Sequence, residues 1–543
     1  MKWIEELKKR WRNRMQKAVA DTGLAREFKS VFEVGGVPSF QQFYFFGIFI
    51  WKWLWKGFYK PWHYIPAPTV ANPDAKREMY RMNVAKAICS EMASLVWGEE
   101  CTVNVSIEGR ESDDENPDPL NDFVQKWLCK NAFREKMQES IEEGLALGGS
   151  ALKVWAEARH DEDGNEIPDT LKLMIGYCMA DQFIPLAWDN AKVTEGVFVS
   201  RIAKGGYYYT RLEWHKWNGL TYVITNELYR SEIQKGKNPE ETQDILGVRY
   251  PLSEIYPYLE EETTIPVEES LFSYWRTPIA NNLDDNSPLG MSIYGNALET
   301  LRALDICYDS FVREFRLGKK RIIVPARAVR SVVDPTTGRL VRYFDANDET
   351  YEALASDDPN DLKIQDNSVE LRVEEHIAAI NAFLSILCLQ TGFSAGTFTF
   401  DQHTGLKTAT EVVSENSKTY KTIKTIQNQL APAVEHLVRN LIDVAILYGM
   451  TTDDGASVES LAAPGYNVQI TFDDGITQDR QTNINEGVML VGAGLLSKYT
   501  FLTDPKYGQG LTPEQAEEEL GRIQQDQPGG GNVNPLEIFG TAE

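Results

Sequence analysis

Two segments in the second half of the chain have a heptad pattern, which is typical of helices that pack along a shared seam. Apolar side chains recur at alternating intervals of three and four residues within 296–317 and again within 373–390. Each segment is therefore predicted to be a helix with one apolar stripe. At ~1.5 Å per residue, the first helix would be roughly 33 Å long. The predicted seam consists of Leu301, Leu304, Tyr308, Phe311, Phe315, Ile377, Ile380, Leu384 and Leu387.

Residues 321–370 lie between these helices and are predicted to form a compact, strand-rich insert. The candidate strands Arg321–Val324 and Leu340–Phe344 flank a turn at Pro335–Gly338. A basic cluster precedes the insert at the carboxyl end of the first helix, where cations complement the helix dipole. The same cations could contact phosphate groups, and the sequence leaves both interpretations open. The cluster includes Arg316, Lys319 and Lys320.

A glycine-rich aromatic segment and a very long helix follow. Residues 392–408 read GFSAGTFTFDQHTGLKT, and their glycines permit backbone conformations that other residues avoid. The long helix is predicted to begin at Thr408, where Glu411 has the spacing of a capping box, and to end at Leu447. Pro432 should kink it, because proline removes a backbone donor and clashes with the preceding turn.

The first half of the chain mixes predicted helices with predicted strands, so the expected class is α+β. Apolar residues at a three-four spacing predict a helix over 73–98, and alternation predicts a strand over 101–107. Residues 151–276 are rich in tyrosine and tryptophan, which favours several strands. Further helices are predicted over 116–147, with a break near Asn131, and later over 483–496 and 512–524.

An aromatic run between Phe43 and Tyr59 leaves three interpretations open. It could be an inter-subunit packing arm, part of an internal core, or an interfacial membrane anchor. A membrane-spanning helix needs about 20 apolar residues. Here Lys52 and Lys56 interrupt the run, and its unbroken apolar part covers only Phe43 to Trp51. A membrane partner is therefore not expected, although the role of the run stays open.

Charge is distributed unevenly along the 543 residues, whose formal net charge is −25. Residues 1–60 contain twelve Lys or Arg and five Asp or Glu, a net of +7, and begin with a basic amphipathic stretch. Residues 450–543 contain four basic and fifteen acidic residues, a net of −11. Proteins that grip DNA usually present an excess of basic side chains to its phosphates. The chain is therefore expected either to ignore nucleic acid or to handle it without holding it.

The sequence offers no recognisable catalytic or metal-binding motif. The nearest approach to a Walker A loop, Gly405–Thr408, lacks the leading glycine and the Gly-Lys pair that hold phosphate. The six histidines are scattered singly, and no two of the six cysteines form a CxxC pair. We therefore expect a protein that is not an enzyme, needs no cofactor and folds in a reducing compartment.

Three stretches resemble the portal proteins of tailed phages, in the group found in long-tailed phages of Gram-positive hosts. They are NVAKAICSEMASLVWGEE at 83–100, SPLGMSIYGNALETLRALDICYDSFVREFRLGKKRIIVP at 287–325 and QTGFSAGTFTFDQHTGLKTATEV at 390–412. The resemblance covers most of residues 73–525 and rests on long family-style sequences rather than on short motifs. The aromatic segment at 38–63 is not a general feature of this family.

The resemblance implies an α+β portal fold assembled as a ring, typically of twelve chains, in which each stem packs against its neighbour. Such a ring would enclose a channel for DNA. The implied parts are an N-terminal arm (1–72), a wing (73–295), a first stem helix (296–320), a clip (321–370), a second stem helix (371–391), a tunnel loop (392–408), a long wing helix with a strand (409–475), and a crown with the C-terminal tail (476–543).

The resemblance also implies a role at the unique vertex of the capsid, in DNA packaging, DNA ejection and the nucleation of prohead assembly. Expected partners are further copies of the chain, double-stranded DNA, the terminase large subunit, a head–tail adaptor, and the major capsid and scaffolding proteins. Assembly would occur in the host cytoplasm, and the terminase would hydrolyse ATP. Another head–tail connector or head-morphogenesis protein is the alternative. The residues expected to face DNA are Gly392, Phe393, Gly396, Phe398, Phe400, Gly405 and Lys407.

Overall fold

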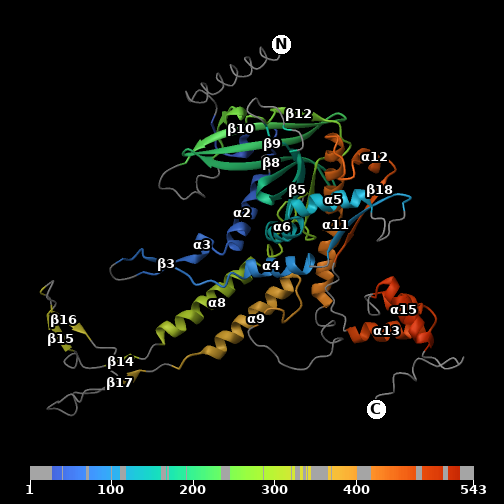
Figure 1. The fold of residues 1–543 in the computed structure, drawn as a ribbon. Helices are drawn as coiled ribbons and strands as arrows, with labels where there is room; N and C mark the ends of the chain where they lie inside the picture. The colour runs from blue at the N-terminus through green and yellow to red at the C-terminus, as the bar shows by residue number, and fades with distance from the viewer. Residues whose placement is uncertain are drawn as a thin grey trace, which may run out of the picture.

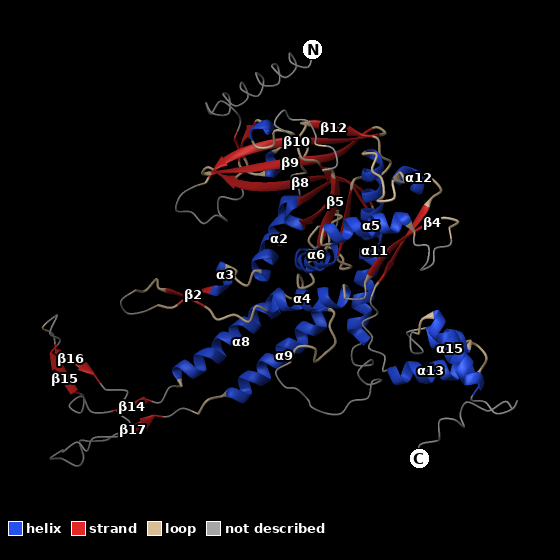
Figure 2. Cartoon of the chain, in the orientation of Figure 1, coloured by secondary structure: helices blue, strands red, loops and turns tan. Residues whose placement is uncertain are grey.

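The computed structural model describes residues 27–525 with several gaps, and these residues form a mixed fold of helices and strands (Figure 1, Figure 2). The predicted α+β class is thereby confirmed. Two long helices, α8 (Leu298–Leu317) and α9 (Val373–Thr391), extend from one side of the body. The residues outside the description are 1–26, 39–40, 69–71, 99–100, 111–117, 161–166, 168–169, 191, 234–244, 285, 319–320, 324–329, 334–337, 339, 344–364, 368–369, 400–416, 473–479, 505–510 and 526–543.

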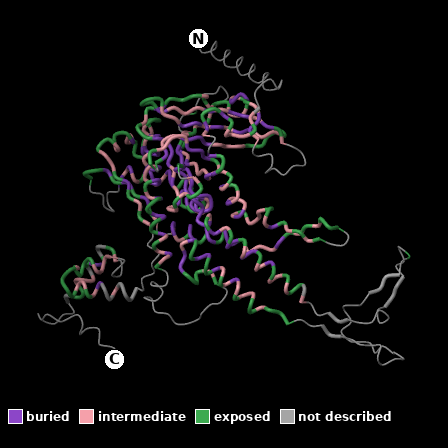
Figure 3. The backbone as a smooth tube through the Cα atoms, turned by 180° about the vertical axis from the view of Figure 1, so that it is seen from behind, coloured by how far each residue is buried: buried purple, intermediate pink, exposed green. Residues whose placement is uncertain are grey.

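The core of the body forms where helices α4 (Val84–Val96), α6 (Phe133–Leu147) and α11 (Ser417–Leu447) pack around a three-stranded sheet. The apolar side chains that recur every three or four residues along α4 face the core, and Ile88 and Met92 are fully buried. Figure 3 shows that buried positions concentrate in this region. The sheet has the order β13-β5-β6, with β5 (Gly149–Glu157), β6 (Lys172–Met179) and β13 (Phe272–Arg276), and α5 (Pro119–Lys130) packs beside α6.

A larger antiparallel sheet forms the upper part of the body in Figure 1. Its path is β1-β11-β10-β9-β8-β7, and β12 pairs with β10. Gly205 and Gly206 supply the positive φ angles that the two-residue turn between β8 and β9 requires. The strands predicted within 151–276 are thereby confirmed. Their bounds are β1 (Glu27–Phe28), β7 (Phe183–Asp189), β8 (Lys192–Lys204), β9 (Tyr207–Asn218), β10 (Thr221–Glu232), β11 (Gly247–Tyr250) and β12 (Glu262–Ile265).

Strand β4 (Thr102–Ile107) pairs antiparallel with β18 (Tyr466–Thr471), although most of the chain separates them in sequence. Asp118 strengthens this corner, because its carboxylate accepts hydrogen bonds from the amide of Ile107 at 2.7 Å and from the amide of Leu120 at 3.0 Å. The second bond caps the start of α5. Beyond α11 the chain also contains α12 (Val458–Ala462), α13 (Arg480–Gly492), α14 (Lys498–Thr503) and α15 (Pro513–Gln525).

Short strands occupy the described part of the insert between α8 and α9. They form two antiparallel pairs, β14 with β17 and β15 with β16. Two of them coincide with the strands predicted at either side of the turn. The pairing of β14 with β17 brings the two ends of the insert together, next to the helices that precede and follow it. The bounds are β14 (Arg321–Ile323), β15 (Arg330–Val333), β16 (Leu340–Tyr343) and β17 (Gln365–Asn367).

The aromatic run forms helix α2 (Gln42–Trp55), and one face of this helix belongs to the core. Tyr44, Ile48 and Trp51 are buried on that face. Tyr294 donates a hydrogen bond from its hydroxyl to the carbonyl of Trp51 at 2.8 Å. The internal-core interpretation is therefore correct for this face, whereas the opposite face is exposed. After α2 come α3 (Lys60–His63) and a hairpin of β2 (Tyr64–Pro66) and β3 (Lys76–Glu78).

The predicted helix over 73–98 and the predicted start of the long helix need separate comment. Residues 76–78 form strand β3, so the helix begins only at Val84, and the prediction was wrong for its first eleven positions, 73–83. The charged residues Lys76–Glu78 carry no apolar pattern, so no local signal predicted a strand there. The long helix is described from Ser417 and remains helical through Pro432 to Leu447, while Thr408 and Glu411 lie outside the described residues.

Gly148 closes α6 in the left-handed region, with a φ of +96°, directly against the carbonyl group of Gly290. An added Cβ would overlap that carbonyl, so Gly148→Ala combines backbone strain with a steric clash. We expect it to lower the free energy of unfolding by about 3 kcal/mol. Gly449 has a φ of +61° and open space around it. Gly449→Ala should therefore lose only about 1 kcal/mol from strain. Urea denaturation measures both losses, and equal losses would contradict the clash.

Burial raises the pKa of Glu143 on α6 to about 7, although Lys52 of α2 partly opposes the shift. The folded protein therefore keeps a proton that the unfolded chain releases above about pH 4.5. The stability that this proton provides is lost as the pH rises from about 4.5 to about 7. We expect Glu143→Gln to raise the free energy of unfolding at pH 8 by about 1–2 kcal/mol, allowing for screening of a half-buried group.

Denaturant unfolding at pH 8 and near pH 4 checks this expectation, because the gain from Glu143→Gln should shrink towards zero at the lower pH. Glu135→Gln is the matched control, since this exposed side chain lies two turns away on the same helix and does not contribute to the shift. A gain that is independent of pH, or one that Glu135→Gln reproduces, would contradict the assignment to Glu143.

Candidate functional site

Helices α8 and α9 pack side by side as they leave the body, and we call them the helix pair (Figure 1). Their ends lie within two residues of the predicted ends. Near the body, the seam between them is closed: Leu304 is 1%, Leu384 4% and Leu387 0% exposed. Leu301 and Ile380 are buried with them. These five predicted seam residues are enclosed within the subunit, so they cannot contact a neighbouring copy.

Farther from the body, the seam opens but the two helices remain connected. Phe311 packs edge to face on Phe315 at 5.2 Å and lies 5.6 Å from the ring of His376. Arg372, just before α9, forms an ion pair with Glu314 of α8 at 3.0 Å. Phe315 is nevertheless 46% exposed. The remaining seam residues, Tyr308, Phe311 and Ile377, are half-buried.

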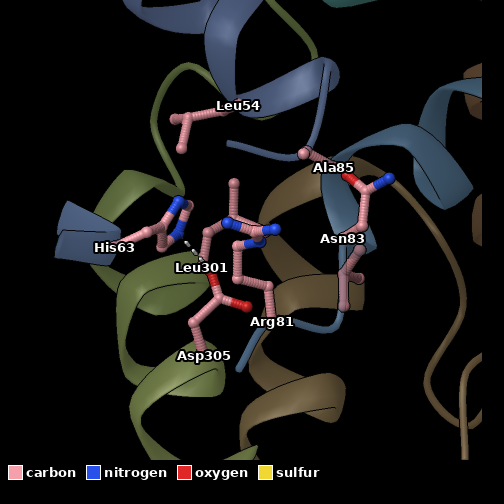
Figure 4. A pocket seen from close by; sticks show the side chains of 9 residues that line it. Leu54, His63, Arg81, Asn83, Ala85, Leu301 and Asp305 are labelled. Carbon is pink, nitrogen blue, oxygen red and sulfur yellow. Dashed lines mark hydrogen bonds and ion pairs between the residues drawn. The ribbon is translucent and has the colours of Figure 1, made fainter. Parts of the chain in front are cut away.

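Asp305 on α8 forms hydrogen bonds with the segment 59–82, which follows α2, and so connects it to the helix pair (Figure 4). The imidazole Nε2 of His63 lies 3.0 Å from one carboxylate oxygen of Asp305. Since the amide of Tyr59 donates to Nδ1 of His63 at 2.9 Å, the ring proton is on Nε2 and is donated to Asp305. The other oxygen accepts from the amide of Met82 at 3.0 Å. Asp305 thus holds both ends of the segment 59–82.

Asp309 lies one turn farther along the same face of α8 and binds the last part of that segment. The guanidinium of Arg77 donates to both oxygens of Asp309, at 2.8 and 2.5 Å. The amide of Tyr80 donates to one of them at 3.1 Å. Burial alone would raise the pKa of Asp309, but these hydrogen bonds and the charge of Arg77 hold it below its ordinary value. The two carboxylates fix how the helix pair leaves the body.

Sequence reasoning missed this pair of aspartates. Asp305 and Asp309 are spaced by four residues inside an apolar helix pattern. That spacing places two charges on one helix face, which is a signal for a buried partner. It does not tell which segment supplies the partner, because Arg77 and His63 come from a part of the chain more than 200 residues earlier.

The loop predicted to face DNA, 392–408, is held in place at its start by buried and hydrogen-bonded residues. Gly392 ends α9 in the left-handed region, with a φ of +86°. Phe393 is completely buried and meets Phe398 edge to face at 5.0 Å. Ser394 and Thr419 bind each other's amides, at 2.8 and 3.2 Å, which ties the loop to the start of α11. Phe393 therefore cannot face DNA, and that prediction is corrected.

The other residues predicted to contact DNA divide into two groups. Gly396 is exposed in a turn with a φ of +87°, and Phe398 is half-buried. Arg316 is exposed near the end of α8, with its guanidinium 5.6 Å from the ring of Tyr80. The predicted residues that lie outside the described part of the chain are Lys319, Lys320, Phe400, Gly405 and Lys407.

The face of α9 that points away from α8 is apolar and open. Ile386 is 44% and Leu389 71% exposed, and the small residues Ala378 and Ala382 continue the same stripe. Within the described residues, α9 is the one helix whose length and composition would suit a membrane span, yet only 22% of its apolar window is buried. Length and composition are weak grounds for a membrane assignment. The exposure of Ile386 and Leu389 shows that this face of α9 has no covering layer within the described part of the subunit.

These sites contain packed apolar side chains and hydrogen-bonded carboxylates. Across the described ranges, no group of three or more His, Cys, Asp or Glu side chains could hold a metal ion. All six cysteines are free thiols. The well-defined features of this region are three. They are the helix pair, the aspartate anchors Asp305 and Asp309, and the loop after Gly392, which we call the tethered loop because Ser394 and Thr419 hold it.

Comparisons with known proteins give one family. Residues 53–528 match the family described as "Phage portal protein, SPP1 Gp6-like". Among solved structures, a chain of "Neck of empty GTA particle computed with C6 symmetry" is similar at 12% sequence identity and a TM-score of 0.38, over 77% of this chain and 89% of that chain. The curated proteins contain no match.

The structural similarity is too distant to guide an assignment, so the assignment depends on the family match. That match includes the helix pair, the insert between its helices, the tethered loop and the long helix α11. Members of the family are structural, non-enzymatic components of the capsid vertex, and they assemble as rings. Because the match covers most of the sequence, the chain belongs to the SPP1 Gp6-like family of phage portal proteins.

Proposed function

We propose that twelve copies of this chain form a ring at the unique capsid vertex, with the helix pair of each copy as a stem around a central channel. Double-stranded DNA passes through this channel during packaging and ejection. The ring also nucleates prohead assembly. The observation that carries the proposal is the open apolar face of α9, which an isolated subunit leaves in water.

The composition of α9 favours a protein neighbour for this face. From His376 to Thr391 the helix has no Asp, Glu, Lys or Arg. An apolar helix face is normally buried against another element. The stem of an adjacent copy can supply the missing layer, and the small side chains of Ala378 and Ala382 permit a short distance between helix axes. In a closed ring the same contact repeats between every pair of neighbours.

The charge of the assembly suits a channel through which DNA slides. Twelve chains of −25 each carry about −300 formal charges, and like charges repel phosphate. DNA would therefore not adhere strongly at any one place. Transient phosphate contacts are assigned to Lys407 and to the basic cluster of Arg316, Lys319 and Lys320.

The proposal divides the chain into functional parts and partners. The insert, as the clip, meets the terminase large subunit during packaging and the head–tail adaptor afterwards. The wing and the crown face the major capsid and scaffolding proteins and the capsid interior. The proposed parts are the arm (1–72), wing (73–295), stem (296–320 and 371–391), clip (321–370), tunnel loop (392–408), long wing helix and strand (409–475) and crown (476–543).

Electron microscopy of the purified full-length chain tests the proposal directly. We expect rings with high rotational symmetry and a central hole wide enough for a DNA duplex. Purified rings should not hydrolyse ATP, since the terminase supplies that activity. Material that stays monomeric under every assembly condition would contradict the proposal. Antibody labelling at several positions of the capsid, instead of at one vertex, would favour another connector or head-morphogenesis protein.

Lys407→Glu should lower the amount of DNA packaged in vitro severalfold while leaving the rings intact. The reason is that this change replaces a cation in the proposed tunnel loop by a charge that repels phosphate. Lys407→Arg keeps the cation and is the matched control. Packaging assays with purified rings and terminase measure the effect, and normal packaging by the Lys407→Glu ring would remove Lys407 from the channel lining.

A further inference from the structure

The outer face of α2 is a row of exposed aromatic side chains. Phe43, Phe46 and Phe49 are 67%, 58% and 42% exposed. The rings of Phe46 and Phe49 stack with their centroids 6.4 Å apart, and Phe49 meets Trp53 edge to face at 6.1 Å. We call Phe43, Phe46, Phe49 and Trp53 the aromatic face. It points away from the body, because the buried residues of α2 occupy the opposite side of the helix.

An aromatic face of this kind needs a covering partner. Scattered exposed hydrophobic residues are ordinary, whereas a contiguous row of large rings on one helix marks a contact surface. The end of the face has a polar border, since Nζ of Lys56 lies 4.7 Å from the centroid of Trp53. The aromatic face therefore has the anatomy of an interface: an apolar centre with a charged rim.

Residues 1–20 of the same chain have the complementary pattern. Their apolar side chains recur at intervals of three and four residues, which forms one stripe if the segment is helical. Such a stripe would be roughly 21 Å long, as would the fourteen residues of α2. Lys2, Lys9 and Lys17 fall on the opposite side. The stripe consists of Ile4, Leu7, Trp11, Met15 and Ala18.

The chain can carry this segment to the aromatic face. Residues 27–28 form β1, and Phe32 shortly afterwards packs on Phe45 of α2 at 5.1 Å between ring centroids. The described chain therefore begins close to the first turn of α2. The eight residues 19–26 can span up to about 27 Å. That reach exceeds the length of α2, so the whole aromatic face is accessible to residues 1–20.

Residues 1–20 and the three phenylalanines of the aromatic face lie before the part of the chain that matches the portal family. The family match begins at residue 53, so it excludes residues 1–20 and all but the last three residues of α2.

We propose that residues 1–20 pack as an amphipathic helix on the aromatic face of α2 in the same chain, with Trp11 over the rings of Phe46 and Phe49. The packing turns Lys2, Lys9 and Lys17 outwards, which gives this part of an acidic protein a basic surface. The inference does not depend on ring assembly.

A disulfide between two introduced cysteines tests the contact in the full-length chain. The variant carries Trp11→Cys and Phe46→Cys, in a background with Cys129→Ser because Cys129 is exposed. Asn13→Cys with Phe46→Cys is the control, since Asn13 lies on the polar side of the stripe. Roughly tenfold more disulfide is expected in the first variant, because the bond needs Cβ atoms about 4 Å apart. Phe49→Cys replaces Phe46→Cys if the first variant does not fold.

The product separates the alternatives. A disulfide within one chain keeps the mobility of a monomer on a non-reducing gel and supports the proposal. A dimer band would place residues 1–20 on a neighbouring copy and overturn it, as would equal yields in variant and control. Flotation of the full chain with vesicles of anionic phospholipid, abolished by deletion of residues 1–20, would overturn it in favour of a membrane surface.

Discussion

Replacement of Leu389 by glutamate should abolish ring assembly while leaving the subunit folded. Leu389 is 71% exposed on the open face of α9, so a charge there costs an isolated subunit little. Between two stems, the same carboxylate would lose its water without gaining a partner, at a cost of several kcal/mol. A ring repeats that cost at every interface. Size-exclusion chromatography with light scattering should find monomers, and circular dichroism at about 25 °C should find an unchanged secondary-structure content, although the melting temperature can fall because the ring contacts are lost.

Leu220→Glu is the matched control for this experiment. Leu220 is 97% exposed in the turn between β9 and β10, far along the chain from the helix pair. Rings should form normally in this variant, because a surface charge at a turn disturbs no proposed contact. If Leu389→Glu also forms rings of normal size, the open face of α9 does not meet a neighbouring stem.

Asp305→Ala should lower the free energy of unfolding by about 3 kcal/mol, the loss expected when a buried ionic partner is removed. The substitution leaves the Nε2–H of His63 and the amide of Met82 without their acceptor. His63 and Asp305 both line the small pocket that Figure 4 shows. The loss should appear in urea denaturation followed by tryptophan fluorescence, because Trp62 neighbours His63 on α3.

Glu299→Ala, on the exposed side of the same helix, is the control and should change the unfolding free energy by less than about 0.5 kcal/mol. Asp305→Asn should fall between the two, since its amide oxygen can still accept one hydrogen bond. A loss from Asp305→Ala no larger than that of the control would show that the aspartate anchor does not hold the helix pair.

These anchors explain how a long helix pair can have a defined direction. Two helices that touch the body only at their ends would be free to pivot, since few contacts resist rotation there. Asp305 and Asp309 instead bind the segment 59–82 along successive turns of α8. In the proposed ring, that connection would keep each stem at a constant angle to the channel.

Local pattern was sufficient wherever a helix or strand depends on its own neighbours. The heptads at 296–317 and 373–390 gave α8 and α9 to within two residues, because a side chain three or four positions away decides a helix stripe. The same holds for the strands of the large sheet, whose alternation and turn glycines are local signals.

Contacts between residues far apart in the sequence could not be predicted from local patterns. No sequence pattern predicts that β4 pairs with β18, since the two strands are separated by more than half of the chain. The burial of Phe393 likewise depends on α11, which packs over the loop. A glycine-rich aromatic sequence looks like an exposed loop until its packing partner is known.

The sequence by itself determined the two seamed helices, the mixed class and the absence of a recognisable catalytic motif. Only the tertiary structure decided which faces are used: that five seam residues close within the subunit, that one side of α2 enters the core, and that two aspartates hold the segment 59–82. The physical reason is that periodicity fixes which residues share a face, whereas burial of that face depends on what the rest of the chain brings against it.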